Sequence, residues 1–211
     1  MIVYGPSLSP YVRKVLVFAA EKGIAVEQST ATRGPDADPA YLAASPFRKI
    51  PALKDGDFLL SDSSAIVAYL DKLKPEPALI PAGAQDCGRA IWLEEFADDI
   101  LGGAVVRIFF NRVVAERLGM QGDLAVADKA EQEDLPKAFA YLETVVPASG
   151  FIVGGALSIA DIAIASPCAN LAHMGMTPDA KAYPKTAAYV ASILARPSFK
   201  TLTDAEKSFF G

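Results

Sequence analysis

Three short segments in the first third of the chain carry side chains that could bind and activate a small thiol. They read "SLSPYVR" from Ser7, "RKIPAL" from Arg48 and "LLSDSSAIVAYL" from Leu59. In the first, Ser9-Pro10 is typical of a helix N-cap followed by proline at the first helical position. A helix start offers unpaired N–H groups and a positive dipole end, which attract an anion such as a thiolate. Ser9 therefore either only caps a helix or also donates a hydrogen bond to a thiolate.

The second and third segments suit the ends of a peptide. Pro51 opens a strand-like run, where its missing N–H matters least. X–Pro bonds are cis in only about 5–6% of cases, so the residues alone favour a trans Ile50-Pro51 bond. Asp62 and Ser63 lie at a second helix start. They are either ordinary caps, or Ser63 holds a carboxylate while Asp62 takes an ammonium group, as an α-amino-acid end would require.

The elements that must position these segments alternate between strand and helix patterns. Apolar spacing predicts strands at 2–4 and 25–30, helices at 10–22 and 62–73, and a hairpin of 50–54 with 58–60 around Asp55-Gly56. Gly34-Pro35 and Asp38-Pro39 predict a loop between the second and third strands. The order is therefore βαβ followed by ββα.

The rest of the chain is predicted to be helical. Pro75, Pro77 and Pro81 indicate a domain boundary, which gives domains at 1–75 and 86–211 with a linker at 76–85. Helical patterns cover 86–118, 124–146, 158–172, 184–195 and 198–207. We expect Gly102-Gly103 to kink the first and Pro136 to interrupt the second. The third is apolar on all sides, which predicts a central, buried helix. The fold class is thus α/β plus all-α.

The composition of the chain argues against several classes of function. The chain has 211 residues, 52% of them hydrophobic, and a net charge of −5. This acidic balance argues against nucleic acid or an anionic membrane as a partner. No stretch approaches the roughly 20 apolar residues of a membrane span. Cys87 and Cys168 form no CxxC pair, and we see no metal-ligand spacing. A reducing, cytoplasmic setting fits best.

A fourth motif, "LSIADIAIAS" at 157–166, completes a recognisable set. Ser158 at an N-cap and Asp161 three positions later form a capping box, with aspartate in place of the usual glutamate or glutamine. Together with "SPFRKIPAL" and "SDSSAIVAYL", in this order, the chain resembles a glutathione S-transferase over nearly its whole length. The resemblance implies an N-terminal thioredoxin-like domain, a C-terminal helical domain, glutathione as co-substrate without a metal, and a homodimer.

The resemblance assigns thiol activation to a serine. Ser9 matches the family's activating serine, and Ser7 is the alternative because the register of the loop is open. Tyr4 is less suited because it lies inside the predicted strand. Pro6 falls nearest the cysteine of the cysteine-type bacterial members, and no cysteine lies in this loop. This argues against a mixed-disulfide, thiol-transferase mechanism.

The same resemblance reverses the expectation for the Ile50-Pro51 bond, since the family carries a cis-proline at this turn. It also implies the remaining contacts with glutathione. These contacts are Lys49 and Arg48 for the glycyl carboxylate, the Ile50 backbone beside cis Pro51 for the cysteinyl part, Asp62 and Ser63 for the γ-glutamyl end, and Asp98 or Asp99 for the glutathione amine of a partner subunit. Asp62 has a shorter arm than the glutamate or glutamine more often found there.

The second domain is expected to supply the electrophile pocket, together with Tyr11 of the first. Arg107, Phe110 and Asn111 have the i, i+3, i+4 spacing that places them on one helix face. That face is either a pocket wall or ordinary core or dimer contact. Phe47, in the loop before Pro51, is either a dimer contact or a packing residue.

The predicted function is therefore attack of the glutathione thiolate on a small apolar electrophile. Two alternatives stay open. The same site could serve a glutathione-dependent peroxidase, dehalogenase or isomerase, or the fold could be a non-catalytic binding module. The sequence does not name the second substrate, because such pockets are built from variable side chains on a reused fold.

Overall fold

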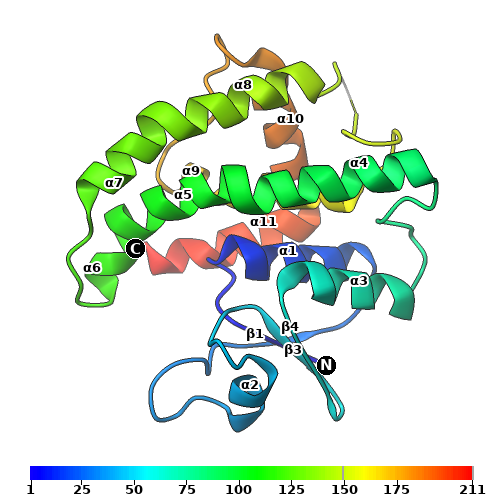
Figure 1. Cartoon of the computed structure of the whole chain (residues 1–211), viewed down its shortest axis with the longest axis vertical. Coiled ribbons are helices and arrows are strands. Elements are labelled where there is room, and N and C mark those ends of the chain that lie inside the picture. The colour runs from blue at the N-terminus through cyan, green and yellow to red at the C-terminus, as the bar shows by residue number, and fades with distance from the viewer. Residues whose placement is uncertain (149, 211) are drawn as a thin grey trace. The chain divides into compact units, whose positions relative to one another are not determined.

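The computed structural model, which describes residues 1–148 and 150–210, divides by packing into two units. The first comprises Met1–Ala82 and the chain from Pro197 onward, and the second comprises Gly83–Arg196. All four strands belong to the first unit, and the second is built of helices (Figure 1). The α/β plus all-α fold class expected from the sequence is confirmed.

The sheet of the first unit has the strand order β2-β1-β3-β4. Its strands are β1 (Ile2–Tyr4), β2 (Glu27–Ser29), β3 (Ala52–Asp55) and β4 (Phe58–Ser61). β1 runs parallel to β2 and antiparallel to β3, and β3 and β4 form the expected hairpin. Gly56 turns this hairpin with φ 58°, a left-handed conformation that glycine adopts without steric cost. β2 is shorter than the predicted 25–30.

The helices of the first unit are α1 (Pro10–Glu21), α2 (Pro39–Ala44), α3 (Ser63–Leu73) and α11 (Pro197–Glu206), followed by the short 3₁₀ turn η4 (Lys207–Phe209). α2 lies where the sequence analysis predicted only loop. Like α1, it begins with a capping residue followed by proline at the first helical position, here Asp38 and Pro39. The Asp38 carboxylate caps the helix by accepting a hydrogen bond from the Ala40 N–H at 2.8 Å.

Two buried basic side chains fix both ends of α1. The Arg13 guanidinium lies 2.7 Å from the Glu206 carboxylate of α11, and both side chains are almost fully buried. The Lys22 ammonium lies 2.8 Å from the Asp71 carboxylate of α3. It also donates to the carbonyl oxygens of Lys74, Pro75 and Pro77 at 2.8, 3.1 and 2.7 Å. Since a buried charge is tolerated only when it is paired, these contacts tie α1 to α11, to α3 and to the segment that follows α3.

The second unit begins with helical turns that run from residue 84 to 117 and continue after a loop from 124 to 145. They are α4 (Ala84–Glu95), η1 (Phe96–Leu101), α5 (Gly102–Phe109), η2 (Phe110–Val114), α6 (Ala115–Arg117), α7 (Leu124–Lys129), η3 (Ala130–Asp134) and α8 (Leu135–Val145). The π-helical segment η1 ends at Leu101, directly before Gly102, and η3 ends at Asp134, two positions before Pro136; Gly102 and Pro136 are the positions expected to disturb each helix. Among the described residues, 1–148 and 150–210, no helix is long and apolar enough to cross a membrane.

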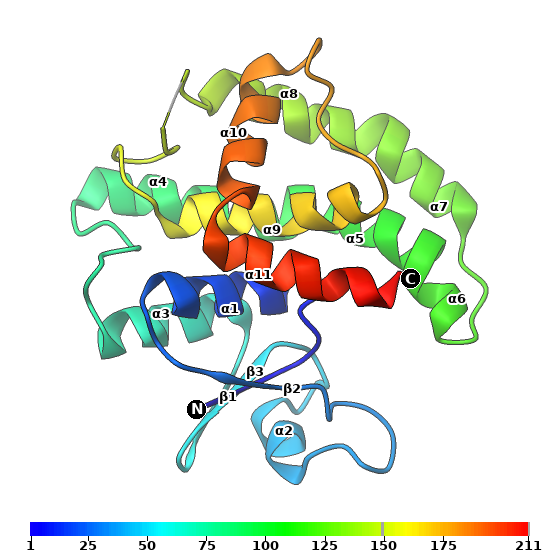
Figure 2. The ribbon, with the colours of Figure 1, turned by 180° about the vertical axis from the view of Figure 1, so that it is seen from behind.

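The core of the second unit surrounds α9 (Ile159–His173), which α10 (Pro184–Leu194) follows. Every residue of α9 from Ile159 to Leu171 is buried, which confirms the central helix expected from its uniform apolarity (Figure 2). The capping box at its start is formed, with the Ser158 N–H donating to the Asp161 carboxylate at 2.8 Å. That fully buried carboxylate also accepts from the Ile152 N–H at 2.9 Å and the Tyr189 hydroxyl at 2.7 Å.

Candidate functional site

The three candidate segments meet at one end of the sheet because of the strand register. Tyr4 of β1 pairs with Ala52 of β3, which in turn pairs with Ser61 of β4. The chain therefore leaves β1, enters β3 and leaves β4 side by side. The residues just beyond this row are Gly5, Pro51 and Asp62.

Gly5 lets the first segment approach the second closely. A Cβ atom at this position would lie 2.6 Å from the Val12 side chain and 3.0 Å from the Ile50 Cβ, and φ is 126°. Only glycine satisfies both conditions. The Gln28 side-chain amide fixes the loop further by donating to the Gly5 carbonyl oxygen at 2.8 Å. The sequence analysis singled out neither residue; Gly5-Pro6 directly after a strand was the available signal.

Ser9 takes the N-cap position of α1 but does not use its hydroxyl as a cap. Its N–H donates to the Pro6 carbonyl oxygen at 3.0 Å, and its own carbonyl oxygen accepts from the Arg13 N–H at 2.9 Å. The side chain makes no capping hydrogen bond and is half-buried. The hydroxyl therefore remains available to a ligand at the helix start. The Ser7 hydroxyl also has no hydrogen-bond partner among the described residues, but Ser7 lies within the preceding turn.

Tyr4 could activate a thiol and Cys168 could act as one, but neither side chain is suited to that role. Tyr4 is fully buried and donates its hydroxyl to the Asp38 carboxylate at 2.8 Å. Burial, followed by this hydrogen bond, raises the pKa of Tyr4 to about 12. Burial likewise raises the pKa of the Cys168 thiol to about 12, so it stays protonated at neutral pH. The serine loop is the better candidate for stabilising a thiolate.

The loop before β3 is held so that Ile50 presents its backbone. The buried Ser45 hydroxyl accepts from the Lys49 N–H at 2.9 Å and donates to the Lys49 carbonyl oxygen at 2.7 Å. The Ile50-Pro51 bond is cis, as the family resemblance implied. Within the described residues, no hydrogen bond uses the Ile50 N–H or carbonyl oxygen. Ser45 is thus a positioning residue that the sequence analysis missed.

Two exposed cations lie on the same loop. Arg48 and Lys49 both have exposed side chains, and Arg48 adopts φ 55°. Neither forms an ion pair with a carboxylate of residues 1–148 or 150–210. Free cations next to an open backbone edge favour a ligand whose end carries a carboxylate.

The start of α3 offers complementary polar groups. Asp62 caps this helix with one carboxylate oxygen, Oδ1, which accepts from the N–H groups of Ser64 and Ala65, both at 3.0 Å. The residue is exposed and has φ 79°. Its other carboxylate oxygen has no partner in the described chain and can therefore accept from an ammonium group. Ser63, at the first helical position, is buried, and the Lys14 ammonium lies 3.4 Å from the Ser64 hydroxyl.

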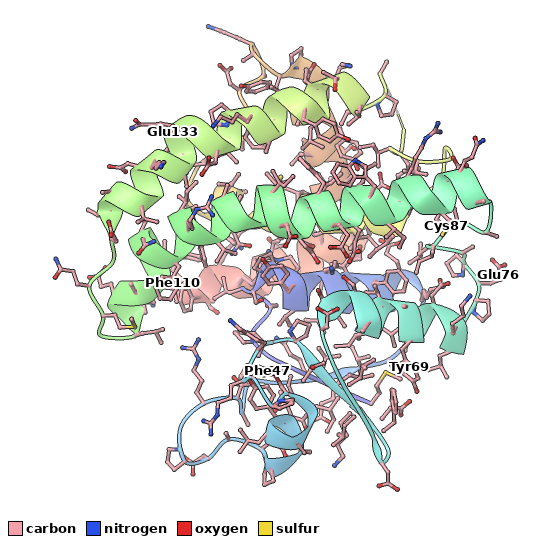
Figure 3. The ribbon with its side chains drawn as sticks, in the orientation of Figure 1. Phe47, Tyr69, Glu76, Cys87, Phe110 and Glu133 are labelled. Atoms are coloured by element: carbon pink, nitrogen blue, oxygen red, sulfur yellow. The ribbon has the colours of Figure 1, made fainter. Side chains whose placement is uncertain are left out.

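The candidate residues of the second unit are engaged in its own packing to different degrees. Arg107 donates to the Asp134 carboxylate at 2.8 Å. Asn111 donates to the Arg107 carbonyl oxygen and accepts from the Asp123 N–H, both at 2.8 Å. Figure 3 labels Phe110, a half-buried side chain on η2. Asp98 is half-buried on η1. A pocket role for these residues and for Tyr11 stays a prediction.

Comparison with known proteins relates this chain to one family. A model of the glutathione S-transferase N-terminal domain matches residues 3–78, and a model of the C-terminal domain matches residues 120–204. Glutathione S-transferase 4 of Zea mays is 31% identical over 208 residues, covering 93% of this chain and 88% of that protein. Glutathione S-transferase 3 of Zea mays is 32% identical over 203 residues, covering 94% and 90%. The chain belongs to the glutathione S-transferase family.

A solved family structure extends this agreement to three dimensions. Glutathione S-transferase I from maize, in complex with an atrazine glutathione conjugate, superposes with a TM-score of 0.81 at 26% identity, covering 98% of this chain and 97% of that one. The N-terminal family model spans every candidate residue of the first unit, from Ser7 to Ser63. The candidates on η1, α5 and η2 fall between the two matched ranges, where the family match adds no support.

Proposed function

We propose that this chain is a glutathione transferase in which Ser9 stabilises the glutathione thiolate for attack on a small apolar electrophile. In this reaction the sulfur forms a bond to an electrophilic carbon, and the leaving group departs with its electron pair. The main observation behind this proposal is that the Ser9 hydroxyl lies at the start of α1 and makes no capping hydrogen bond.

A hydrogen bond from Ser9 is strong enough to lower the pKa of a bound thiol. A thiol has an ordinary pKa of about 8.5, and each unit of pKa depression requires about 1.4 kcal/mol of preferential stabilisation of the thiolate. A hydrogen bond to a charged group contributes about 1.5–3 kcal/mol. Ser9 alone can therefore lower the pKa of the bound thiol by about one to two units, and the positive end of α1 acts in the same direction.

The three segments give each part of glutathione a partner. The Ile50 backbone pairs with the cysteinyl residue in the manner of an added strand, since its N–H and carbonyl oxygen are open. Lys49 and Arg48 bind the glycyl carboxylate. Asp62 accepts from the γ-glutamyl ammonium through its uncommitted oxygen, and Ser63 at the helix start holds the α-carboxylate.

We expect Lys49→Ala to raise KM for glutathione about five- to tenfold while kcat changes less than twofold. The ammonium binds an end of the peptide remote from the sulfur, and such an exposed charge-assisted contact is worth about 1 kcal/mol. Steady-state kinetics with varied glutathione measure the effect, which should shrink at high salt. Lys72→Ala is the matched control, because Lys72 is an exposed lysine at the far end of α3. An unchanged KM in Lys49→Ala would contradict the assignment.

We also propose that the protein is a homodimer. Phe47 has 86% of its surface exposed, so it is not a packing residue within this chain (Figure 3). An aromatic ring this exposed suits insertion into a partner. Asp98 would then reach the glutathione amine bound by the partner.

For the electrophile, Tyr11 and Phe110 offer apolar surface, whereas the polar groups of Arg107 and Asn111 form hydrogen bonds within the helical unit.

A cytoplasmic location is also proposed. Cys87 and Cys168 are both free thiols, and chains whose cysteines remain unpaired are typical of reducing compartments.

The test is an assay of the purified protein with glutathione and three probes: a chloro-nitroarene, an organic hydroperoxide and a maleyl compound. We expect conjugation of the chloro-nitroarene at a rate well above the uncatalysed one. Turnover of only the hydroperoxide or only the maleyl compound would favour the peroxidase or isomerase alternative. Retention on immobilised glutathione with no turnover of any probe would identify a binding module instead.

A further inference from the structure

The loop that carries Ser9 leaves the sheet through one conformationally free residue. A side chain at Gly5 would clash with Val12, because its Cβ would lie 2.6 Å from that side chain, and φ is 126°. The fold therefore requires glycine here, although glycine restricts the backbone less than any other residue. As a result, a hinge lies four positions before the hydroxyl that acts on the thiolate.

β2 holds this hinge from both sides of the glycine. Ser29 of β2 pairs with Tyr4, the last residue of β1, and Gln28 precedes Ser29 (Figure 2). The Gly5 N–H donates to the Ser29 carbonyl oxygen at 2.8 Å. The Gly5 carbonyl oxygen accepts from the Gln28 side-chain amide, also at 2.8 Å. The first bond joins two backbones and does not depend on residue type, whereas the second requires the side chain of Gln28.

The orientation of the Gly5 carbonyl group is transmitted to Ser9. The ring of Pro6, the next residue, restricts its φ to about −65°, so the plane of the Gly5 peptide narrows the directions that the Pro6 carbonyl group can take. That carbonyl oxygen accepts from the Ser9 N–H at 3.0 Å. A continuous series of contacts thus leads from the Gln28 amide through Gly5 and Pro6 to the residue at the start of α1.

We propose that Gln28 is a positioning residue that keeps the Ser9 hydroxyl within hydrogen-bonding reach of the glutathione sulfur. This inference rests on the proposed function, because it takes Ser9 as the group that stabilises the thiolate. A hydrogen bond weakens steeply when its distance or angle departs from the optimum, so a loop that swings about Gly5 stabilises the thiolate less. The peptide ends of glutathione have other partners, and Gln28 therefore affects the rate of reaction and not the affinity for glutathione.

Replacing Gln28 with methionine tests this role. The variant removes the amide donor but keeps an unbranched, uncharged side chain, and the backbone pairing of residue 28 with Val3 is retained. We expect kcat at saturating glutathione to fall about threefold at neutral pH. In a pH profile of kcat/KM for the electrophile, the inflection should move upward by about half a unit. KM for glutathione should change less than twofold. A side chain that only stabilised the fold would not move the inflection.

Gln85→Met is the matched control. Gln85 is an exposed glutamine on α4, so this variant makes the same chemical change in the other unit. Neither kcat nor the inflection should change.

A double-mutant cycle with Ser9→Ala separates positioning of the hydroxyl from a general effect on the loop. If Gln28 acts through Ser9, Gln28→Met should lower kcat less than twofold in the Ser9→Ala background, because the hydroxyl that it positions is absent. An unmoved inflection in Gln28→Met, or an equal loss of kcat in both backgrounds, would overturn the role of Gln28 alone. Wild-type turnover in Ser9→Ala would overturn the proposed role of Ser9, and that of Gln28 with it.

Discussion

Replacing Ser9 with alanine should reduce turnover about ten- to thirtyfold at neutral pH. The hydroxyl favours the charged form of the bound thiol, so its loss raises the thiol pKa by about one to two units and lowers the thiolate fraction accordingly. In a pH profile of kcat/KM for the electrophile, measured at saturating glutathione, the inflection should move upward by the same one to two units. KM for glutathione should change little, because the peptide ends keep their partners. Stability should also be nearly unchanged, since the side chain makes no capping bond.

Ser7→Ala is the control for this result. It removes a hydroxyl from the same loop, one turn before the helix start, and we expect near-normal turnover. Wild-type turnover in Ser9→Ala would sink the assignment. If Ser7→Ala alone lost activity and moved the inflection, the thiolate would lie against Ser7. A large loss of thermal stability in Ser9→Ala would instead indicate that the Ser9 side chain stabilises the start of α1 as a cap.

Replacing Asp161 with alanine should have the largest effect on stability, lowering the free energy of unfolding by about 3–5 kcal/mol. The carboxylate is fully buried and accepts from the N–H groups of Ser158 and Ile152 and from the Tyr189 hydroxyl. Its removal leaves several buried donors without an acceptor, each at about 1–3 kcal/mol. Burial, reinforced by the Asp161 carboxylate, holds the pKa of Tyr189 well above its ordinary value, so this donor stays protonated. Urea unfolding measures the change.

Two variants calibrate the Asp161 result. Tyr189→Phe removes one donor and keeps the acceptor, so it should cost only about 1 kcal/mol. Asp179→Ala removes an exposed carboxylate that accepts from the Lys181 N–H, and it should cost less than about 1 kcal/mol. Equal stability losses in Asp161→Ala and Asp179→Ala would show that the buried network is not what stabilises the start of α9.

Local signals in the sequence predicted most of the fold. Ser9-Pro10 placed the start of α1 correctly, and Asp55-Gly56 placed the hairpin. Asp38-Pro39 carried the same signature as Ser9-Pro10 but was taken as a loop, because the short helix that follows lacks an extended apolar pattern. The π-helical segments η1, η2 and η3 could not be predicted, since an i→i+5 closure leaves little trace in apolar periodicity.

The site was predictable in its segments but not in its supports. Residue types and spacing indicated Ser9 and Asp62, the family resemblance added Lys49, and the strand register brings their segments to one end of the sheet. Gln28 was missed because its contact with the Gly5 carbonyl oxygen joins segments that are separated in the sequence. Ser45 begins a quoted motif, but its hydrogen bonds to the Lys49 backbone depend on the fold of the loop and leave no mark in the sequence. Periodicity placed Arg107 and Asn111 on one helix face, but it could not reveal the Asp134 and Asp123 partners that occupy them.

The pairing of Arg13 with Glu206 has a consequence for the order in which the protein is made. The two residues lie 193 positions apart, and the whole second unit is encoded between the parts of the first. During synthesis, α1 emerges from the ribosome long before the carboxylate that neutralises its buried guanidinium. The first unit therefore begins to form before the second unit is synthesised, and it is completed only afterwards, when α11 packs against α1.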